Sequence, residues 1–554
     1  MGTGSPLVLI LGGGINGCAL ARELALNGVS SWVVDSQDIA SGATSGSSRL
    51  IHGGLRYLEY GELALVKESL AERTRLLQLA PQFVHPLRLW IPAENRMGGA
   101  LAAVGRFFDL RHWPSPKRSR GAWVVRAGLT FYDAYANDPH LPKHRVVNLA
   151  SPGAPCVNQQ RYRWLCAYYD AQVTFPERLT LSMLTDAAEL ASQAGADFRV
   201  LPHHVAKLRD ARVEISRSGE SEPAHILRPE VIVNAAGAWV DETLAQLHVP
   251  SKRLTGGTKG SHLFTYNSRL LDILGGQGIY AEAHDGRPIF ITPLDRTVLI
   301  GTTDLPFNAS PEDATASAAE IEYLLDAVNS IVPSAKLQEG DVAFHYSAVR
   351  PLPYVNASSP AAITRRHALV RNEAAPIPLL SIIGGKLTTM RSLAETAAES
   401  VLSILDRAPQ RDSRTRLFPG AENYPSNEES LDAARSQIAR STGFSLEQVA
   451  QAWKLLGTRA EAVLAKSADR ESLPDTDLPV AAARHAIEHE WAATLADLIE
   501  RRLMLLYHQR LSRACLARLA DLLVESGQLL AGQAQTSVSD EVVRLAARFG
   551  KRVD

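Results

Sequence analysis

The sequence predicts an α/β core that begins with a Rossmann-like nucleotide-binding unit, followed by an all-helical C-terminal domain. Three observations support this class: a strand–glycine turn–helix unit near the N-terminus, strand-like alternation over residues 261–303, and a helical composition from residue 430 onward. Strands that alternate with helices indicate a layered α/β core, and a purely helical tail indicates a separate unit.

The N-terminal unit has the pattern of a β-strand, an α-helix and a second β-strand. Leu7–Leu11 is a continuous apolar run, which is typical of a strand buried on both faces of a parallel sheet. Residues 18–27 carry Ala and Leu at helical spacing, and Gly28 follows where a glycine commonly ends a helix. Residues 32–35 are expected to form the second strand.

The turn inside this unit contains the most specific motif, Gly12-x-Gly14-x-x-Gly17. Gly12 permits the tight turn, Gly14 lets the backbone approach a pyrophosphate, and Gly17 lets helix and strand pack closely. The start of the helix offers free N–H groups to the phosphates. Asp35, at the end of the second strand, is placed to accept hydrogen bonds from a ribose. We therefore predict dinucleotide binding.

Two further segments suit a large cofactor, although each has a plainer interpretation. Residues 41–59 are dense in small and hydroxyl side chains, which could wrap a flat ring system or form a flexible surface loop. Residues 382–389 repeat the strand–glycine–helix pattern, so a helix N-terminus there could stabilise negative charge on a cofactor, or simply make a turn.

Size, charge and cysteine content limit the class of protein. The 554 residues suggest two to four folding units, and a net charge of -1 argues against a dedicated nucleic-acid binder. No C-x-x-C pair or ligand-spaced cysteine cluster is present, which indicates a reducing, intracellular compartment and no metal site. No export signal and no apolar run long enough to span a membrane is recognisable.

A change in composition divides the chain. Residues 1–406 are expected to form the α/β core, residues 407–429 a polar, proline-bearing linker, and residues 430–554 the helical domain.

Several segments together resemble the FAD-dependent glycerol-3-phosphate dehydrogenase family of aerobic, bacterial type, within a wider group that includes glycine oxidase and D-amino-acid oxidase. The segments that carry the resemblance are GGGINGCALARELALNG, DIASGATSGSSRLIHGGLRYLEYGELALVKESLAER, VNAAGAWV, KGSHLF, IGTTD, YSAVRPL, AITR, GGKLTTMRSLAE and, more weakly, HAIEHEWAATLADLIERR. The resemblance implies an α/β fold in which a Rossmann-like FAD-binding domain is interleaved with a mixed-sheet substrate domain, with the all-helical C-terminal domain following.

The resemblance also implies roles for individual residues. The FAD site would comprise Gly12, Gly14, Gly17, Asp35, Ser41, Ser47, Ser48, Gly237, Gly385, Lys386, Leu387 and Thr388. Substrate would be held by Arg56, Tyr57 and Arg365, and the catalytic residues would be His262, Arg350 and Lys386. A cluster of cations suits a phosphomonoester, which carries nearly two negative charges and binds guanidinium groups in a bidentate manner.

The reaction implied by the resemblance is oxidation of sn-glycerol 3-phosphate to dihydroxyacetone phosphate, with hydride transfer to FAD. A general base should have a pKa near the working pH, so His262 is the expected base, while Arg350 and Lys386 would stabilise alkoxide character. Met390 and the segment 168–176 depart from the family pattern, which leaves the substrate preference open.

The electron acceptor is expected to be a membrane quinone, as in the bacterial dehydrogenases of the family. Three alternatives remain: an oxidase that reduces O₂, an amine-oxidising flavoenzyme of the same superfamily, and a non-enzymatic flavin-binding module.

Residues 105–126 are the expected contact with the membrane. The segment contains six basic residues and one acidic residue, with aromatic residues between them. The charged residues are Arg106, Arg111, Lys117, Arg118, Arg120, Arg126 and Asp109. Such a segment binds anionic lipid or forms a solvated loop. The prediction is a cytoplasmic protein, peripheral on the inner face of the cytoplasmic membrane. Homodimer formation is left open.

Overall fold

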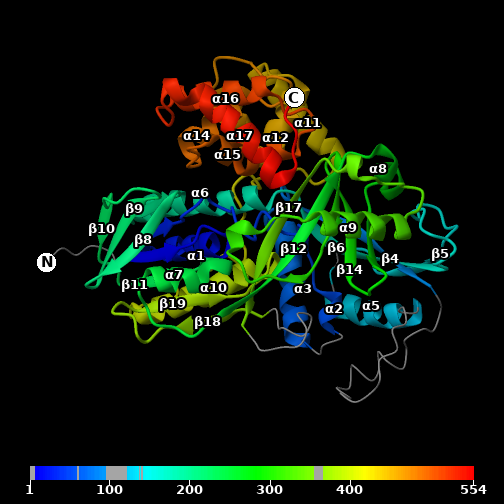
Figure 1. Cartoon of the computed structure of the whole chain (residues 1–554), viewed down its shortest axis with the longest axis horizontal. Helices are drawn as coiled ribbons and strands as arrows, with labels where there is room; N and C mark the ends of the chain where they lie inside the picture. Colours follow the sequence, from blue (N-terminus) through cyan, green and yellow to red (C-terminus); the bar gives the residue numbers. More distant parts are fainter. Residues whose placement is uncertain (1–6, 59–61, 95–121, 137, 139–140, 355–365) are drawn as a thin grey trace.

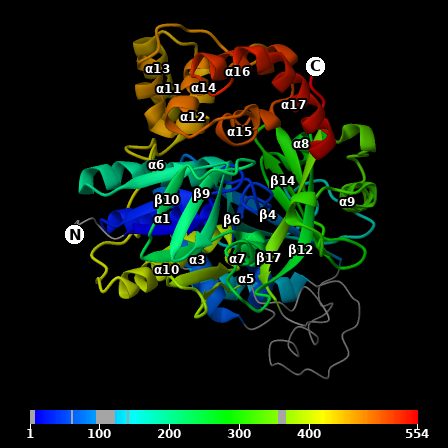
Figure 2. The ribbon, with the colours of Figure 1, turned by 60° about the vertical axis from the view of Figure 1, so that its left-hand side comes forward.

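The computed structural model describes residues 7–58, 62–94, 122–136, 138, 141–354 and 366–554. Two large β-sheets lie beside one another in the lower part of the molecule, and the helices of the C-terminal region lie across them (Figures 1 and 2). A smaller, three-stranded sheet consists of β8 (His204–Arg209), β9 (Arg212–Arg217) and β10 (His225–Leu227). The predicted fold class is confirmed. Within the described residues, no helix combines the length and the apolar character needed to cross a membrane.

The first sheet has six strands in the order β18-β19-β11-β1-β2-β7. Its strands are parallel except for the edge strand β18, and the central ones are buried apart from Leu7, in keeping with their mainly apolar sequences. The strands are β1 (Leu7–Leu11), β2 (Ser30–Val34), β7 (Phe198–Leu201), β11 (Val231–Asn234), β18 (Ala368–Arg371) and β19 (Leu379–Ile383).

Three helices pack beside this sheet. Helix α1 (Ile15–Leu26) contacts both α6 (Pro176–Ala194) and α10 (Met390–Ile404), although these helices are far apart in the sequence. Gly28 follows α1 with a φ of 65°, which is the conformation that a helix-ending glycine adopts. The first sheet is therefore assembled from the beginning, the middle and the end of the α/β core.

The second sheet has ten strands in the order β16-β12-β15-β14-β13-β4-β6-β3, with β17 paired to β12 and β5 paired to β6. The chain leaves the first sheet, builds part of the second and returns, so the two units are interleaved. The strands are β3 (Leu50–Ile51), β4 (Val84–Ala93), β5 (Arg145–Asn148), β6 (Trp164–Val173), β12 (Thr255–Thr265), β13 (Gly278–Glu282), β14 (Pro288–Leu294), β15 (Thr297–Gly301), β16 (Leu305–Pro306) and β17 (Phe344–Pro353).

The strand-like alternation expected over residues 261–303 is confirmed, with one interruption. A short helix, α8 (Ser268–Leu274), joins β12 to β13, and Asn267 begins it by accepting a hydrogen bond from the N–H of Leu270. Asparagine is a favoured residue at this position because its side chain satisfies a free N–H of the first turn.

The C-terminal region is helical, as predicted. Its helices are α11 (Glu428–Thr442), α12 (Leu446–Leu456), α13 (Ala460–Ala465), α14 (Val480–His489), α15 (Leu495–Asp497), α16 (Arg513–Glu525) and α17 (Ala534–Phe549), with a π-helical turn at Leu498–Arg502. Its apolar core continues into the second sheet, because Phe264 of β12 and Phe344 of β17 belong to the same buried cluster as Leu516 and Leu519 of α16.

The segment 407–427, between α10 and α11, contains no helix or strand but is anchored to the first sheet. The guanidinium group of Arg22 donates a hydrogen bond of 3.0 Å to the carbonyl oxygen of Leu417 and lies over the ring of Phe418, which is fully buried. This segment therefore fixes the helical region against α1 instead of acting as a loose tether.

Candidate active site

One pocket of about 330 Å³ lies between the two sheets and collects most of the predicted site residues. It is bounded by the carboxyl end of β1, the turn after β11, one face of β12 and β17, and the glycine turn after β19. The predicted residues that line it are Gly12, Gly14, Asp35, Ser41, Ser47, Ser48, Tyr57, Gly237, His262, Arg350, Gly385, Lys386, Leu387 and Thr388.

The first glycine turn is shaped to receive a ligand. Gly12 has a φ of 114°, and a Cβ atom there would lie 2.6 Å from the carbonyl oxygen of Ala235. A Cβ atom on Gly17 would overlap the carbonyl oxygen of Gly12, so Gly17 lies behind the turn and allows close packing. Gly14 differs, since the nearest atom to a Cβ there is Thr44 Oγ1 at 3.7 Å. The free space next to Gly14 opens into the pocket.

Asp35 lies at the edge of the pocket, directly after β2. Its Oδ2 accepts a hydrogen bond of 2.6 Å from the N–H of Gly13, and its Oδ1 accepts one of 2.8 Å from the N–H of Gln37. Burial raises the pKa of Asp35 to about 6. A carboxylate has about four acceptor positions, so the two that remain can bind the hydroxyl groups of a ribose.

The second glycine turn closes the other end of the pocket. Gly384 and Gly385 have φ angles of 77° and 95°, and a short 3₁₀ helix, Leu387–Thr389, then leads into α10. The hydroxyl of Thr388 accepts a hydrogen bond of 3.1 Å from the N–H of His52. The two glycine turns and the serine-rich loop 41–48 therefore face one pocket, which fits an extended dinucleotide such as FAD.

Arg350 has a fixed orientation in the pocket. Its Nη1 donates to Asp304 Oδ1 at 2.9 Å and its Nη2 donates to Thr302 Oγ1 at 3.0 Å. Gly260, on the neighbouring strand β12, leaves room for the guanidinium group, because a Cβ atom there would overlap it. Arg350 therefore brings a guanidinium group to the wall of the pocket, and such a group can bind an anion by charge-assisted hydrogen bonds.

Lys386 approaches the same pocket from the second glycine turn. Its Nζ donates a hydrogen bond of 3.0 Å to Ser69 Oγ and lies 4.1 Å from the centre of the Tyr57 ring. Arg56 is part of the short helix α2 (Leu55–Leu58), but its side chain is outside the described part of the structure, and Arg365 lies outside it entirely.

His262 is buried on β12, and its Nε2 shares a hydrogen bond of 2.8 Å with Ser48 Oγ. Burial lowers the pKa of His262 to about 3, with smaller contributions from the positive charges of Arg350 and Arg49. The pKa of His262 therefore lies well below the working pH, contrary to the expectation for a general base. The imidazole is neutral at physiological pH and is a weak proton acceptor. A negative charge close to the ring would raise its pKa and its basicity.

Sequence reasoning missed the residues that support the site. Thr302 and Asp304 belong to the IGTTD segment, which carried the family resemblance without an assigned role, and they orient Arg350. Arg49 lies within the serine-rich segment, but nothing in its spacing indicates that it is completely buried. Tyr346 lies on β17, directly across from His262 on β12.

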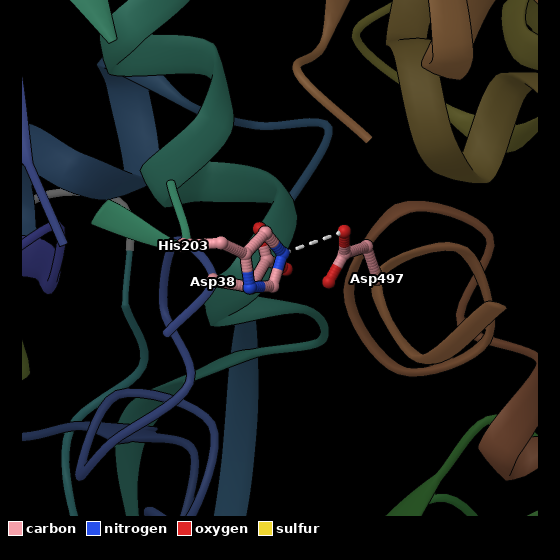
Figure 3. A group of neighbouring side chains, drawn as sticks. All are labelled: Asp38, His203 and Asp497. Carbon is pink, nitrogen blue, oxygen red and sulfur yellow. Dashed lines mark hydrogen bonds and ion pairs between the residues drawn. The ribbon is translucent and has the colours of Figure 1, made fainter. Parts of the chain in front are cut away.

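A second cluster of polar side chains joins the helical region to the first sheet (Figure 3). Asp38 follows β2, His203 follows β7, and Asp497 lies in α15, with His203 Nε2 3.0 Å from Asp497 Oδ2. Arg502 donates hydrogen bonds of 2.6 and 2.7 Å to Asp38, and Arg501 pairs with both carboxylates. Because two guanidinium groups already neutralise the carboxylates, the cluster holds the helical region to the first sheet and is a poor site for a cation.

The fold and the pocket define an FAD-dependent oxidoreductase. The family model described as FAD dependent oxidoreductase matches residues 8–370, and the model described as the C-terminal domain of alpha-glycerophosphate oxidase matches residues 412–529. The solved structure of the glycerol-3-phosphate dehydrogenase from Bacillus halodurans, complexed with FAD, has the same fold, with a TM-score of 0.74 and 21% identity over 99% of this chain and 96% of that chain.

Curated relatives define the family more closely. A glycerol-3-phosphate dehydrogenase from Synechocystis sp. is 36% identical over 89% of this chain and 88% of its own length. D-erythritol 1-phosphate dehydrogenase from Brucella abortus is 31% identical over 89% and 93%, and the aerobic glycerol-3-phosphate dehydrogenase from Escherichia coli is 29% identical over 89% and 93%. The chain belongs to the FAD-dependent glycerol-3-phosphate dehydrogenase family, which confirms the predicted family and the predicted cofactor.

Proposed function

We propose that the protein oxidises sn-glycerol 3-phosphate to dihydroxyacetone phosphate and passes the electrons to a quinone. The observation that carries this proposal is the meeting of Arg350, Lys386 and His262 in the pocket that the FAD-binding glycine turns also line. Relatives that act on glycerol 3-phosphate, according to their names, support the same substrate.

The two cations suit the substrate's negative charge. Arg350, oriented by Asp304 and Thr302, lines the pocket and brings its guanidinium group to a phosphate or to the oxygen on C2. Lys386, which follows the second glycine turn, adds a compact point charge to the same pocket. We assign Arg56, Tyr57 and Arg365 to substrate binding as well.

His262 is assigned to proton transfer. Its Nδ1 has no hydrogen-bond partner among the described residues, whereas its Nε2 is occupied by Ser48, so one ring nitrogen is left for the hydroxyl group on C2. Entry of a phosphate dianion places negative charge near a buried imidazole, which raises its pKa toward neutrality. FAD, when bound, supplies the hydride acceptor, and the side chains position the substrate and remove the proton.

The test begins with the purified flavoprotein under anaerobic conditions. Addition of glycerol 3-phosphate should bleach the flavin absorbance, and a water-soluble quinone should restore it faster than air does. Restoration by air with stoichiometric peroxide would favour the oxidase alternative. Bleaching by sarcosine or a D-amino acid, with no response to glycerol 3-phosphate, would reject the proposal in favour of an amine-oxidising enzyme.

D-Erythritol 1-phosphate is a second candidate substrate, because a relative named for it is 31% identical to this chain. It also carries a phosphate and an oxidisable alcohol, so the same anaerobic titration separates the two. The better substrate is the one with the larger second-order rate constant for flavin reduction.

We further propose the boundaries 1–406, 407–429 and 430–554 for the core, the connecting segment and the helical domain. Residues 105–126 are proposed to attach the protein to the inner face of the cytoplasmic membrane; most of this segment lies outside the described residues. The charge reversal Arg118→Glu with Arg120→Glu should release the protein from anionic vesicles, and unchanged binding would assign the attachment elsewhere. A homodimer is testable by light scattering of the same preparation.

A further inference from the structure

The geometry points to Tyr507, in the C-terminal helical region, as a positioning residue for the active site: it acts through Arg49 to hold the Ser47–Ser48 loop and His262 in place. This inference rests on the proposed function, because it concerns the group assigned to proton transfer. It also gives the helical region a role in catalysis in addition to its packing role.

Arg49 directly follows Ser48 and is completely buried. Its φ is 56°, a left-handed conformation that few residues other than glycine adopt. A strained backbone at the edge of a ligand site persists only where the surrounding contacts hold it. The position of the Ser47–Ser48 loop therefore depends on what fixes the Arg49 side chain.

Several contacts hold the Arg49 guanidinium group. Its two terminal nitrogens donate to the two carboxylate oxygens of Glu177, and Nη1 also donates to the carbonyl oxygen of Thr174 at 2.6 Å. The remaining direction of Nη2 is occupied by the hydroxyl of Tyr507, whose ring lies 4.7 Å from the guanidinium carbon. Glu177 and Thr174 belong to the α/β core, so Tyr507 is the contact that the helical region supplies.

Two hydrogen bonds connect this centre to the reactive side of the pocket. The hydroxyl of Tyr346 donates a hydrogen bond of 2.6 Å to the carbonyl oxygen of Ser47 and accepts a long one of 3.4 Å from Arg49 Nε. Ser48 Oγ then holds His262 Nε2 at 2.8 Å. A displacement of Arg49 thus moves the serine loop and, with it, the hydrogen bond that orients the imidazole.

Tyr507 is itself rigidly placed. Its ring packs against Phe264 and Phe344, with ring centres 5.4 and 5.3 Å apart, and its carbonyl oxygen accepts a hydrogen bond of 3.1 Å from the hydroxyl of Tyr266. Phe264 follows His262 on β12, and Tyr266 comes directly after the end of that strand. Through Tyr507, the helical region therefore packs against β12 beyond His262 and also contacts Arg49, next to the Ser47–Ser48 loop.

The test compares the FAD-loaded full-length protein with Tyr507→Phe, which removes only the hydroxyl. We expect kcat for glycerol 3-phosphate, measured with an artificial acceptor, to fall about tenfold, because small misplacements of catalytic groups are costly. KM should stay within about twofold, since Arg350 and Lys386 lie on other elements. The matched control is Tyr424→Phe, which removes a hydroxyl that accepts a hydrogen bond of 3.2 Å from Trp453 Nε1 in the same region of the chain.

A second variant separates positioning from packing. Tyr507→Leu removes the ring as well, so a purely structural role predicts that Phe matches the wild type while Leu lowers both the melting temperature and the FAD content. The inference requires the kcat loss to be present already in Tyr507→Phe, at unchanged melting temperature and FAD content. A wild-type kcat in Tyr507→Phe would overturn it, whereas a wild-type protein inactive with glycerol 3-phosphate would overturn the proposed function.

Discussion

Ser48 Oγ and His262 Nε2 lie 2.8 Å apart, and this contact links the loop after β2 to the second sheet. One partner comes from the segment that faces the cofactor site, and the other is the residue assigned to proton transfer. The cofactor and substrate parts of the pocket are therefore connected by this hydrogen bond and by the one from Tyr346 to Ser47. Substitutions on either side of this connection should separate binding effects from catalytic effects.

Gly14→Ala should weaken FAD binding without unfolding the protein. A Cβ atom at Gly14 meets nothing closer than Thr44 Oγ1 at 3.7 Å, but it would occupy the space that a pyrophosphate needs next to the start of α1. We expect the FAD dissociation constant to rise at least about tenfold, or ~1.4 kcal/mol, with the melting temperature of the apoprotein unchanged.

Gly17→Ala is the matched substitution three residues further on. Its Cβ atom would overlap the carbonyl oxygen of Gly12, so this variant should lose stability as well as FAD. Equal FAD affinity in wild type and Gly14→Ala, measured by fluorescence titration, would show that the pyrophosphate does not approach this turn.

Arg350→Lys should lower kcat/KM for glycerol 3-phosphate by about 10²-fold or more, because removing one donor to a developing negative charge costs that much in comparable sites. Lysine keeps the charge but cannot bond Asp304, Thr302 and substrate with one planar fork. Arg371→Lys, at an exposed ion pair with Glu373, should leave kcat/KM unchanged. Steady-state kinetics that show similar values for both variants would remove Arg350 from the site.

His262 should make the folded state sensitive to acid. Its folded pKa of about 3 lies below the unfolded value near 6.5, so protons bind the unfolded chain preferentially in this window. Stability is fully present above pH ~6.5 and falls, by at most about 1.4 kcal/mol per pH unit, as the pH drops toward 3. His262→Gln removes this titration. The difference in unfolding free energy between the two proteins, from urea titrations at pH 7, 6, 5 and 4, should shrink steadily, and a constant difference would contradict the cause.

Much of the fold was predictable because its first sheet is built from strands with simple patterns. Leu7–Leu11 is a continuous apolar run and Leu379–Ile383 a mainly apolar one, and both occur as strands with those bounds. Strands β4 and β6 were not identified, since their burial does not alternate regularly and their formation depends on pairing between distant segments.

Most of the residues that line the candidate site were also predictable. Glycine motifs and family segments located the residues that line the pocket, because their spacing encodes local turns. The pKa of His262 and the burial of Arg49 were not predictable, since both depend on residues more than a hundred positions away, such as Glu177 for Arg49 and Arg49 for His262.

Arg178→Met should destabilise the attachment of the helical region more than any exposed ion pair there. Arg178 of α6 donates hydrogen bonds of 2.5 and 2.7 Å to Glu490, and both side chains are buried. Removing one partner leaves an uncompensated buried charge, which typically costs about 3–5 kcal/mol. Arg484→Met, which breaks a partly exposed pair with Glu525, should cost less than about 1 kcal/mol. Thermal unfolding of the two variants measures the contrast. Equal melting temperatures would mean that water reaches Glu490 and that the helical region is held chiefly by its apolar contacts with β12 and β17.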